Sequence, residues 1–338
     1  MVSSGEFAVI VFRMLGSSPF EVNSYFFLLQ VGRRMKKLIE TLVFGGGGVR
    51  GICFIGVLKY LSELKDSGVL RMDIKEVCGV SVGTIFGLFY VLGFTVEEME
   101  REIIEKDLEK LRRISFMNFW GNWGLDTGEN IVAWMESLLL RKLECTRNMT
   151  FREMYARVPI KFNVLAGNLN RYAFEEFNHD KTPDFPVLDA IRMSIGIPIV
   201  FTKKKYNGDT ILDGGIICSY PIDLYKDRID TTLGFKNVTL GEENESVYNE
   251  INSIESFLYN LFSCFMVQRD KRIIMGQDFE KHTVKLHAKF DDILKFKLTK
   301  EDKLEMVEDG YNKTKAAFER NWEINEKVVK EIETENLV

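Results

Sequence analysis

The stretch Gly79-Val80-Ser81-Val82-Gly83 has the pattern G-x-S-x-G, and the rest of the chain is interpreted around it. A short apolar run, Glu76–Cys78, precedes it, and a helix-like run, Thr84–Leu92, follows it. Strand, serine and helix in this order predict a nucleophile elbow, in which the serine stands on a sharp, strained turn. The two glycines remove Cβ atoms that would collide across that turn. The plainer alternative is a glycine-bracketed turn with an incidental serine.

A glycine-rich loop lies upstream, in Gly45-Gly46-Gly47-Gly48-Val49-Arg50-Gly51. Leu38–Phe44 before it predicts a buried strand, and the apolar spacing from Ile52 to Leu64 predicts a helix ending at Gly68. The loop's N–H groups suit an anion. A dinucleotide site would need an acidic residue at the end of a second strand, and a phosphate loop would need Lys-Ser or Lys-Thr; both are absent. An oxyanion hole for an acyl-transfer serine fits.

A third motif, Asp213-Gly214-Gly215, follows two predicted strands, Ile199–Phe201 and Thr210–Leu212, which flank a polar hairpin at Lys203–Asp209. An aspartate at the end of a strand, followed by two glycines, predicts a carboxylate at the rim of a sheet with open space beside it. An ordinary Asp-Gly turn is the alternative.

The order of the predicted elements indicates an α/β fold with a parallel sheet covered on both faces. Helices are expected at 95–112, 129–143, 187–195, 250–275 and 300–331, and further strands at 161–166, 171–177, 231–238 and 283–288. We expect residues 1–34 to form a poorly ordered N-terminal extension and residues 35–338 to form one domain. Neither apolar run in the extension reaches the roughly 20 residues that span a bilayer.

The composition excludes several classes of protein. The net charge is −5, from 45 basic and 50 acidic residues, so nucleic acid is not an expected partner. The 5 cysteines lack C-x-x-C spacing, and there are only 3 histidines. These counts argue against a zinc site or a disulfide framework and favour a reducing compartment, the cytoplasm.

The segment Ile114–Leu125 is rich in large apolar side chains. Its members are Phe116, Met117, Phe119, Trp120 and Trp123. We expect them to pack on the core. A lid or a membrane-facing loop is the alternative, with Phe116, Trp120 and Trp123 as contact residues.

The three motifs, in this order, resemble those of the patatin-like phospholipase family. Gly46–Gly51 matches its G-G-G-x-[RK]-G loop, Gly79–Gly83 its nucleophile elbow, and Asp213–Gly215 its D-G-[AG] box. A lesser signature, Ser194–Pro198 followed by Phe201, also fits, and the resemblance covers about residues 38–320. One departure is Ser219-Tyr220-Pro221, where family members often have Asn-x-Pro, and it bears on local loop geometry more than on catalysis.

The resemblance implies a three-layer α/β/α sandwich with a mainly parallel central sheet and a Ser–Asp dyad. Ser81 would be the nucleophile and Asp213 the base. The N–H groups of the oxyanion loop would come from Gly46, Gly47, Gly48, Val49 and Arg50. The supporting motif glycines would be Gly51, Gly79, Gly83, Gly214 and Gly215. The implied substrates are phospholipids or other acyl lipids met at a membrane surface, and the chemistry needs no metal or other cofactor.

Two alternatives remain open from the sequence. An α/β-hydrolase has a triad in the order Ser, Asp, His, so His282 or His287 could complete Ser81 and Asp213. The residues around both histidines predict a strand and its approach, which disfavours the glycine-bearing loop on which such a histidine usually lies. The other alternative is a catalytically silent module that binds lipid, and the intact motifs count against it.

Overall fold

The computed structural model describes residues 38–238, 278–287 and 295–322, together with residues 251, 257, 260, 261, 264, 324, 329 and 332. The predicted extension, residues 1–34, lies outside the described residues. So do most of the expected helix at 250–275 and most of the chain after residue 322. The single-domain interpretation of residues 35–338 therefore stays a prediction.

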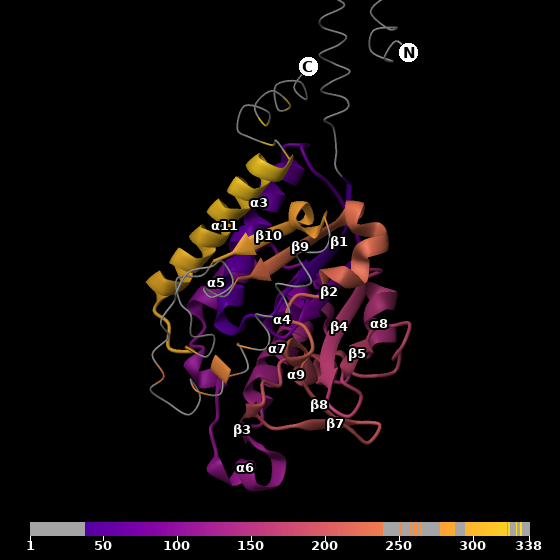
Figure 1. Cartoon of the computed structure of the whole chain (residues 1–338), viewed down its shortest axis with the longest axis vertical. Coiled ribbons are helices and arrows are strands. Elements are labelled where there is room, and N and C mark those ends of the chain that lie inside the picture. The colour runs from indigo at the N-terminus through magenta and orange to yellow at the C-terminus, as the bar shows by residue number, and fades with distance from the viewer. Residues whose placement is uncertain are drawn as a thin grey trace, which may run out of the picture.

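Strands and helices alternate along the described chain (Figure 1). The strands are β1 Leu38–Phe44, β2 Arg71–Val80, β3 Gly124–Asp126, β4 Lys161–Asn168, β5 Ala173–Phe177, β6 Ile199–Phe201, β7 Lys204–Tyr206, β8 Asp209–Asp213, β9 Thr232–Asn237 and β10 Thr283–Leu286. The α-helices are α3 Cys53–Asp66, α4 Val82–Val91, α5 Val96–Glu105, α6 Phe116–Asn122, α7 Glu129–Leu143, α8 Phe151–Arg157, α9 Val187–Ser194 and α11 Lys300–Trp322. The 3-10 helices are η1 Gly48–Ile52, η2 Glu109–Leu111, η3 Gly214–Ile216, η4 Ile222–Thr231 and η6 Asp278–His282.

The main sheet has the strand order β10-β9-β1-β2-β4-β8-β7, with β5 paired to β4. The five strands from β10 to β4 are parallel, whereas β5, β7 and β8 pair antiparallel. The sheet is therefore mainly parallel and helices flank it, as the sequence predicted (Figure 1).

The central strands are apolar on both faces because both are covered. Leu42 and Phe44 of β1 belong to the larger core cluster, which includes residues of α3, α4, α9 and α11. Val43 between them faces a smaller cluster with Tyr220 and Tyr225, beside η4. Such burial on both sides explains why these strands are continuous apolar runs in the sequence.

The two edges of β4 determine where the chemistry lies. One edge pairs with β5 along Val164–Asn168. The other edge pairs first with β2, up to Leu165, and then with β8, from Ala166 onward. The strands β2 and β8 therefore approach each other along one edge of β4 from opposite directions. The residue after β2 and the last residue of β8 meet at this point.

The expected helix at 95–112 is shorter than predicted, since α5 ends at Glu105. The reason is a contact from a distant helix. The buried Lys303 of α11 donates hydrogen bonds to the carbonyl oxygens of Ile103, Ile104 and Lys106, at 3.1, 3.2 and 2.6 Å. A cation at a helix C-terminus satisfies carbonyl groups that have no partner within the helix.

The predicted strands Ile199–Phe201 and Thr210–Leu212 and the polar hairpin between them are all present, but the two strands do not pair with each other. Strand β6 instead pairs in parallel with β3, in a separate two-stranded sheet. The partner of β8 is β7, and the turn between them is Asn207-Gly208. Both turn residues have positive φ, 49° and 87°, which is typical of a tight two-residue hairpin.

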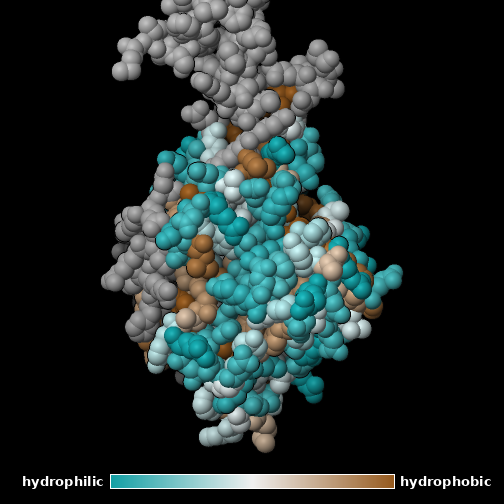
Figure 2. Space-filling view, turned by 90° about the vertical axis from the view of Figure 1, so that its right-hand side faces the viewer, coloured by the Kyte–Doolittle hydropathy of each residue, from teal (hydrophilic) through white to brown (hydrophobic). Residues whose placement is uncertain are grey.

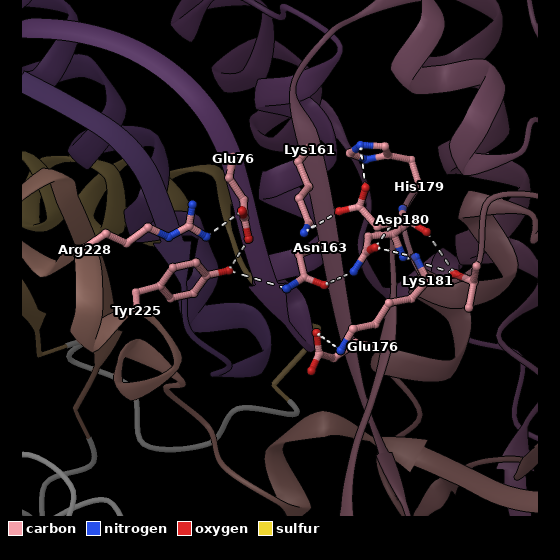
Figure 3. A network of polar contacts seen from close by, with 11 residues as sticks. Glu76, Lys161, Asn163, Glu176, His179, Asp180, Lys181, Tyr225 and Arg228 are labelled. Atoms are coloured by element: carbon pink, nitrogen blue, oxygen red, sulfur yellow. Dashed lines mark hydrogen bonds and ion pairs between the residues drawn. The ribbon is translucent and has the colours of Figure 1, made fainter.

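A polar network ties together the faces of β2, β4 and η4 upstream of the point where β2 and β8 meet (Figure 3). The buried Glu76 of β2 accepts hydrogen bonds from Tyr225 and Arg228 of η4, both at 2.7 Å. Asn163 of β4 bridges Tyr225 and Asn178, at 3.5 and 3.0 Å. A buried carboxylate is costly unless it is paired in this way, so we interpret the network as structural.

Helices α3 and α11 pack backbone against backbone. A Cβ atom added at Gly56 of α3 would lie 1.9 Å from the carbonyl oxygen of Val307, and one added at Gly310 of α11 would lie 2.0 Å from that of Cys53. Neither position has room for a side chain, because its neighbour is backbone.

We predict that Gly310→Ala lowers stability by about 1–3 kcal/mol, because overpacking forces the two helices apart. Gly121→Ala, in the exposed helix α6, is the matched control, since no atom lies within 4 Å of its added Cβ. Urea unfolding followed by circular dichroism measures both. Equal midpoints for Gly310→Ala and the wild type would contradict the packing argument.

Candidate active site

Ser81 lies on a sharp turn between β2 and α4, with φ 54° and ψ −131°. This conformation is strained for a residue with a side chain, and it persists where the surroundings enforce it. The flanking glycines permit the crossing. A Cβ atom at Gly83 would lie 2.2 Å from the carbonyl oxygen of Phe44, and one at Gly79 would lie 2.7 Å from the carbonyl carbon of Gly83. The geometry is that of the predicted nucleophile elbow.

The Oγ atom of Ser81 donates a hydrogen bond of 2.6 Å to Oδ2 of Asp213. The other carboxylate oxygen, Oδ1, accepts a hydrogen bond of 2.7 Å from the N–H of Gly215. Both side chains are buried, with exposed fractions of 6% for Ser81 and 5% for Asp213. The expectation that Asp213 lies at the rim of the sheet is therefore wrong. Strand β8 runs antiparallel to β4 and carries Asp213 inward, level with Ala166.

Burial raises the pKa of Asp213 from its ordinary value of 3.8 to about 7. The hydrogen bonds from Ser81 and Gly215 act in the opposite direction, because they stabilise the carboxylate. A carboxyl group with this pKa can accept and return a proton near neutral pH. The pair thus has the geometry and the acidity of a nucleophile and its base.

The glycine-rich loop lies directly beside Ser81. A Cβ atom at Gly46 would be 3.4 Å from that of Ser81, and Gly48 and Val49 line the same cavity as the serine. Gly48 and Val49 also begin η1, and the first N–H groups of a helix have no acceptor within it. These N–H groups can bind an anion that forms next to Ser81.

Two side chains, those of Asn237 and Arg50, stabilise this loop by hydrogen bonds to backbone carbonyl groups. Asn237, at the end of β9, donates to the carbonyl oxygen of Gly46 at 3.0 Å, and Arg50 donates to that of Val238 at 3.2 Å. The Nδ2 atom of Asn237 would lie only 2.5 Å from a Cβ atom at Gly47. Arg50 is itself buried, so its guanidinium supports the loop and does not point to solvent.

The remaining motif glycines are explained by close approach or by a donated hydrogen bond. A Cβ atom at Gly51 would be 2.7 Å from Val82, and one at Gly214 would be 2.5 Å from the carbonyl oxygen of Leu165. Gly215 supplies the N–H group that binds Asp213. The structure therefore brings all the predicted site residues into one region.

Sequence reasoning assigned no role to Ser194, which supports the elbow directly. Its Oγ accepts a hydrogen bond of 3.0 Å from the N–H of Ser81 and donates one of 2.6 Å to the carbonyl oxygen of Leu165. It satisfies a buried N–H group that the strained turn leaves without a strand partner. The only sequence signal was the signature Ser194–Pro198, which gave no indication of the contact.

An apolar cavity of about 90 Å³ adjoins Ser81. Its walls come from the glycine loop, from α4, α5, α7 and η2, and from the segment after α9. The lining side chains beyond the loop are Ile52, Ser81, Val82, Ile85, Phe86, Ile103, Leu108, Leu111, Ile131, Trp134, Ile195, Ile197, Phe201 and Phe296. All of them except Ser81 are apolar or aromatic, so the cavity suits a hydrocarbon chain.

The histidines occupy other parts of the fold. His179 stacks on Tyr155, with ring centroids 3.6 Å apart, in the turn after β5. His282 precedes β10, whose parallel register places that end opposite the end that carries Ser81. His287 follows β10, which is separated from β2 by β9 and β1. Three strand spacings of about 4.8 Å lie between them.

Comparisons with known proteins identify relatives over most of the chain. The family model described as patatin-like phospholipase matches residues 42–225, more than half of the chain. Protein YqhO of Bacillus subtilis strain 168 is 31% identical over 304 residues, which cover 83% of this chain and 98% of the bacterial protein. The probable lipid hydrolase 463L of Invertebrate iridescent virus 6 is 30% identical over 194 residues, which cover 56% of this chain and 63% of the viral protein.

A solved structure supports the fold. The crystal structure of VipD from Legionella pneumophila superposes with a TM-score of 0.51 at 16% identity, over 84% of this chain and 67% of that one. The family model spans the nucleophile elbow, the glycine loop and the Asp-Gly-Gly motif. This chain therefore belongs to the patatin-like phospholipase family of ester hydrolases.

Proposed function

We propose that the protein is a lipid acyl hydrolase of the phospholipase A type, with Ser81 as nucleophile and Asp213 as general base. The observation that carries the proposal is the buried hydrogen bond of 2.6 Å between Ser81 Oγ and Asp213 Oδ2. It joins a strained serine to a carboxyl group with a pKa of about 7, beside N–H groups that lack acceptors within η1. Nucleophile, base and oxyanion donors are the three parts that acyl transfer needs.

In the first half of the reaction, Ser81 Oγ attacks the ester carbonyl carbon and its proton passes to Asp213. The carbonyl oxygen becomes an oxyanion, which accepts hydrogen bonds from the N–H groups of Gly48 and Val49 at the start of η1. The N–H of Gly46 donates instead to the carbonyl oxygen of Ser219 at 2.8 Å, and that of Arg50 to the carbonyl oxygen of Gly47 at 3.2 Å. When this intermediate collapses, the bond to the alkoxide breaks and the alkoxide takes the proton from Asp213. The products are a free alcohol and an acyl-serine.

In the second half, water replaces the alcohol. Asp213 accepts a proton from the attacking water, and a second tetrahedral intermediate forms on the acyl carbon. Its collapse breaks the bond to Ser81 Oγ, which recovers the proton from Asp213. The fatty acid leaves, and the hydrogen bond between serine and aspartate forms again.

The apolar cavity supports an acyl chain as the group that is transferred. Transfer of a hydrocarbon chain from water into this aliphatic and aromatic lining is favourable by about 0.8 kcal/mol per methylene. The substrates proposed are phospholipids or related acyl lipids, met at a membrane surface in a reducing compartment. The family supports a lipid substrate, and the cavity supports its acyl part.

The triad alternative needs a histidine within hydrogen-bond reach of Asp213. The strand order counts against it, since His282 and His287 flank the edge strand β10, which is separated from β2 by β9 and β1. The silent-module alternative would need a broken catalytic pair, and the contact between Ser81 and Asp213 counts against it.

We predict that Ser81→Ala abolishes hydrolysis of an activated acyl ester without unfolding the protein, because the covalent route needs the hydroxyl. A fluorophosphonate probe should label the wild type at Ser81 and leave Ser81→Ala unlabelled. Ser62→Ala, near the C-terminal end of α3, is the control and should keep full activity. If Ser81→Ala were still labelled, Ser81 would not be the nucleophile.

We predict that Asp213→Asn is nearly as inactive as Ser81→Ala, because an amide cannot accept the proton. His179→Ala, His282→Ala and His287→Ala should each keep most of the wild-type turnover. One folded histidine variant that loses several orders of magnitude would instead establish a triad.

The pH profile is the second measurement on this pair. Asp213 must be ionised to act as base, so kcat/KM should rise with pH and level off above a midpoint near its pKa of about 7. A histidine can titrate in the same range, so the profile gives the pKa of the base and the variants give its identity.

We predict that Gly48→Ala lowers turnover on the order of 10²-fold, because the change moves N–H donors away from the oxyanion. Gly48 has φ 55°, so any side chain there strains the loop. Gly208→Ala is the matched control, since Gly208 also has a positive φ but lies in the β7–β8 turn with no atom near its added Cβ. Equal turnover in both variants would contradict the oxyanion assignment.

A further inference from the structure

Helix α6 and its flanks carry large apolar side chains into solvent. The exposed fractions are 76% for Phe116, 82% for Met117, 84% for Trp120 and 62% for Trp123, and α6 has no buried residue. The expectation that these side chains pack on the core is therefore wrong. Helix α6 lies at the lower tip of the molecule, away from the sheet (Figure 1). We call residues 114–123 the aromatic projection.

The segments in and beside the projection are rich in basic residues, although the protein as a whole is acidic. Residues 110–125 contain Lys110, Arg112 and Arg113 but no acidic residue, and residues 202–208 contain three consecutive lysines but no acidic residue. The backbone N–H of Lys203 donates to Asn122 at 3.0 Å, and its Nζ lies 3.1 Å from the ring centroid of Trp123. The lysine run therefore lies against the projection, although the whole chain has a net charge of −5.

The lower tip is also distinct in the surface view. In Figure 2 the lowest part of the molecule shows tan and white residues, whereas most of the described surface in that view is teal. Large apolar side chains that cluster on a solvent-exposed surface usually mark an interaction site. Tryptophan and phenylalanine suit the boundary between lipid head groups and acyl chains, because their rings are partly polar or polarisable.

The base of the projection is hydrogen-bonded to strand β3 and adjoins the cavity beside Ser81. Buried Asp126 of β3 accepts hydrogen bonds from the N–H groups of Arg113 and Gly128, at 2.6 and 2.7 Å. Strand β3 pairs with β6, whose Phe201 lines the cavity, as does Leu111 just before the projection. If the projection binds a surface, that surface therefore lies close to the walls of the cavity beside Ser81.

We propose that the aromatic projection anchors the protein to an anionic lipid surface. Phe116, Met117 and Trp120 enter the interface, and the basic side chains of Arg113, Lys203 and Lys205 lie against anionic head groups. Among the described residues, the neighbouring Lys110 and Lys204 are ion-paired with Asp107 and Glu129, whereas no ion pair is recorded for Arg113, Lys203 or Lys205. The described residues include no helix with the length and hydropathy to span a bilayer. Basic residues near a membrane surface each contribute about 1 kcal/mol to binding anionic lipid.

The inference rests on the proposed function, because a lipid surface is where such a substrate is found. Binding is therefore measured on the full chain carrying Ser81→Ala, so that failure to bind and failure to hydrolyse are observed separately. The assay is flotation with phosphatidylcholine vesicles, with and without phosphatidylserine. The background variant should bind the phosphatidylserine vesicles more strongly, and added salt should weaken that binding.

Adding Phe116→Ala and Trp120→Ala to this background should lower the partition coefficient on the order of tenfold or more, since two aromatic side chains no longer enter the interface. Adding Arg113→Gln and Lys205→Gln should remove the preference for phosphatidylserine. Tyr172→Asn is the control, because Tyr172 is an aromatic side chain that is 87% exposed elsewhere. Asparagine tolerates the positive φ at that position.

Thermal unfolding by circular dichroism checks that each variant is folded. Equal vesicle binding by the aromatic variant and its background would overturn the proposal. So would the absence of binding to phosphatidylserine vesicles. A dimer in sedimentation analysis that is lost with Phe116→Ala and Trp120→Ala, without vesicle binding, would assign the projection to a second copy of the chain instead.

Discussion

The structure depends on two strands that share one edge of β4. Strand β2 pairs with β4 as far as Leu165, and β8 pairs with β4 from Ala166 onward, so the two strands point toward each other along one line of backbone. A parallel and an antiparallel partner can meet in this way only because their directions are opposite. The hydroxyl of Ser81 and the carboxylate of Asp213 occupy the junction. The pair is held by the sheet itself and not by flexible loops.

The junction lowers stability through backbone strain at Ser81 and burial of the Asp213 carboxyl group, and hydrogen bonds from neighbouring residues offset part of this loss. Ser81 has a positive φ, and its N–H group cannot pair within the sheet, so Ser194 accepts that hydrogen bond. Asp213 is buried without a cation recorded beside it among the described residues, which raises its pKa. The N–H of Gly215 and the hydroxyl of Ser81 limit the cost of ionisation. Strain and desolvation of this kind are common where a site is prepared for chemistry.

Local signals predicted most elements correctly, and the errors have identifiable causes. Helix α7 and strand β1 have the bounds expected from periodicity. The end of α5 was missed because a lysine some two hundred residues away caps it. The polar hairpin at Lys203–Asp209 was predicted, but the pairing of β6 with β3 was not, because β3 lies about 75 residues away in the sequence. The aromatic segment was misassigned because composition does not say which side of a helix meets the core.

The sequence by itself determined the α/β class, the elbow around Ser81, the glycine loop and the family. These features depend on neighbours along the chain, because a sharp turn needs small residues at set spacings and a buried strand needs a continuous apolar run. Only the tertiary structure decided that Asp213 lies inside the sheet, that Ser194 supports Ser81, and that the aromatic projection faces solvent. Each of these results from strands and helices distant in sequence, whose direction and packing no local pattern specifies.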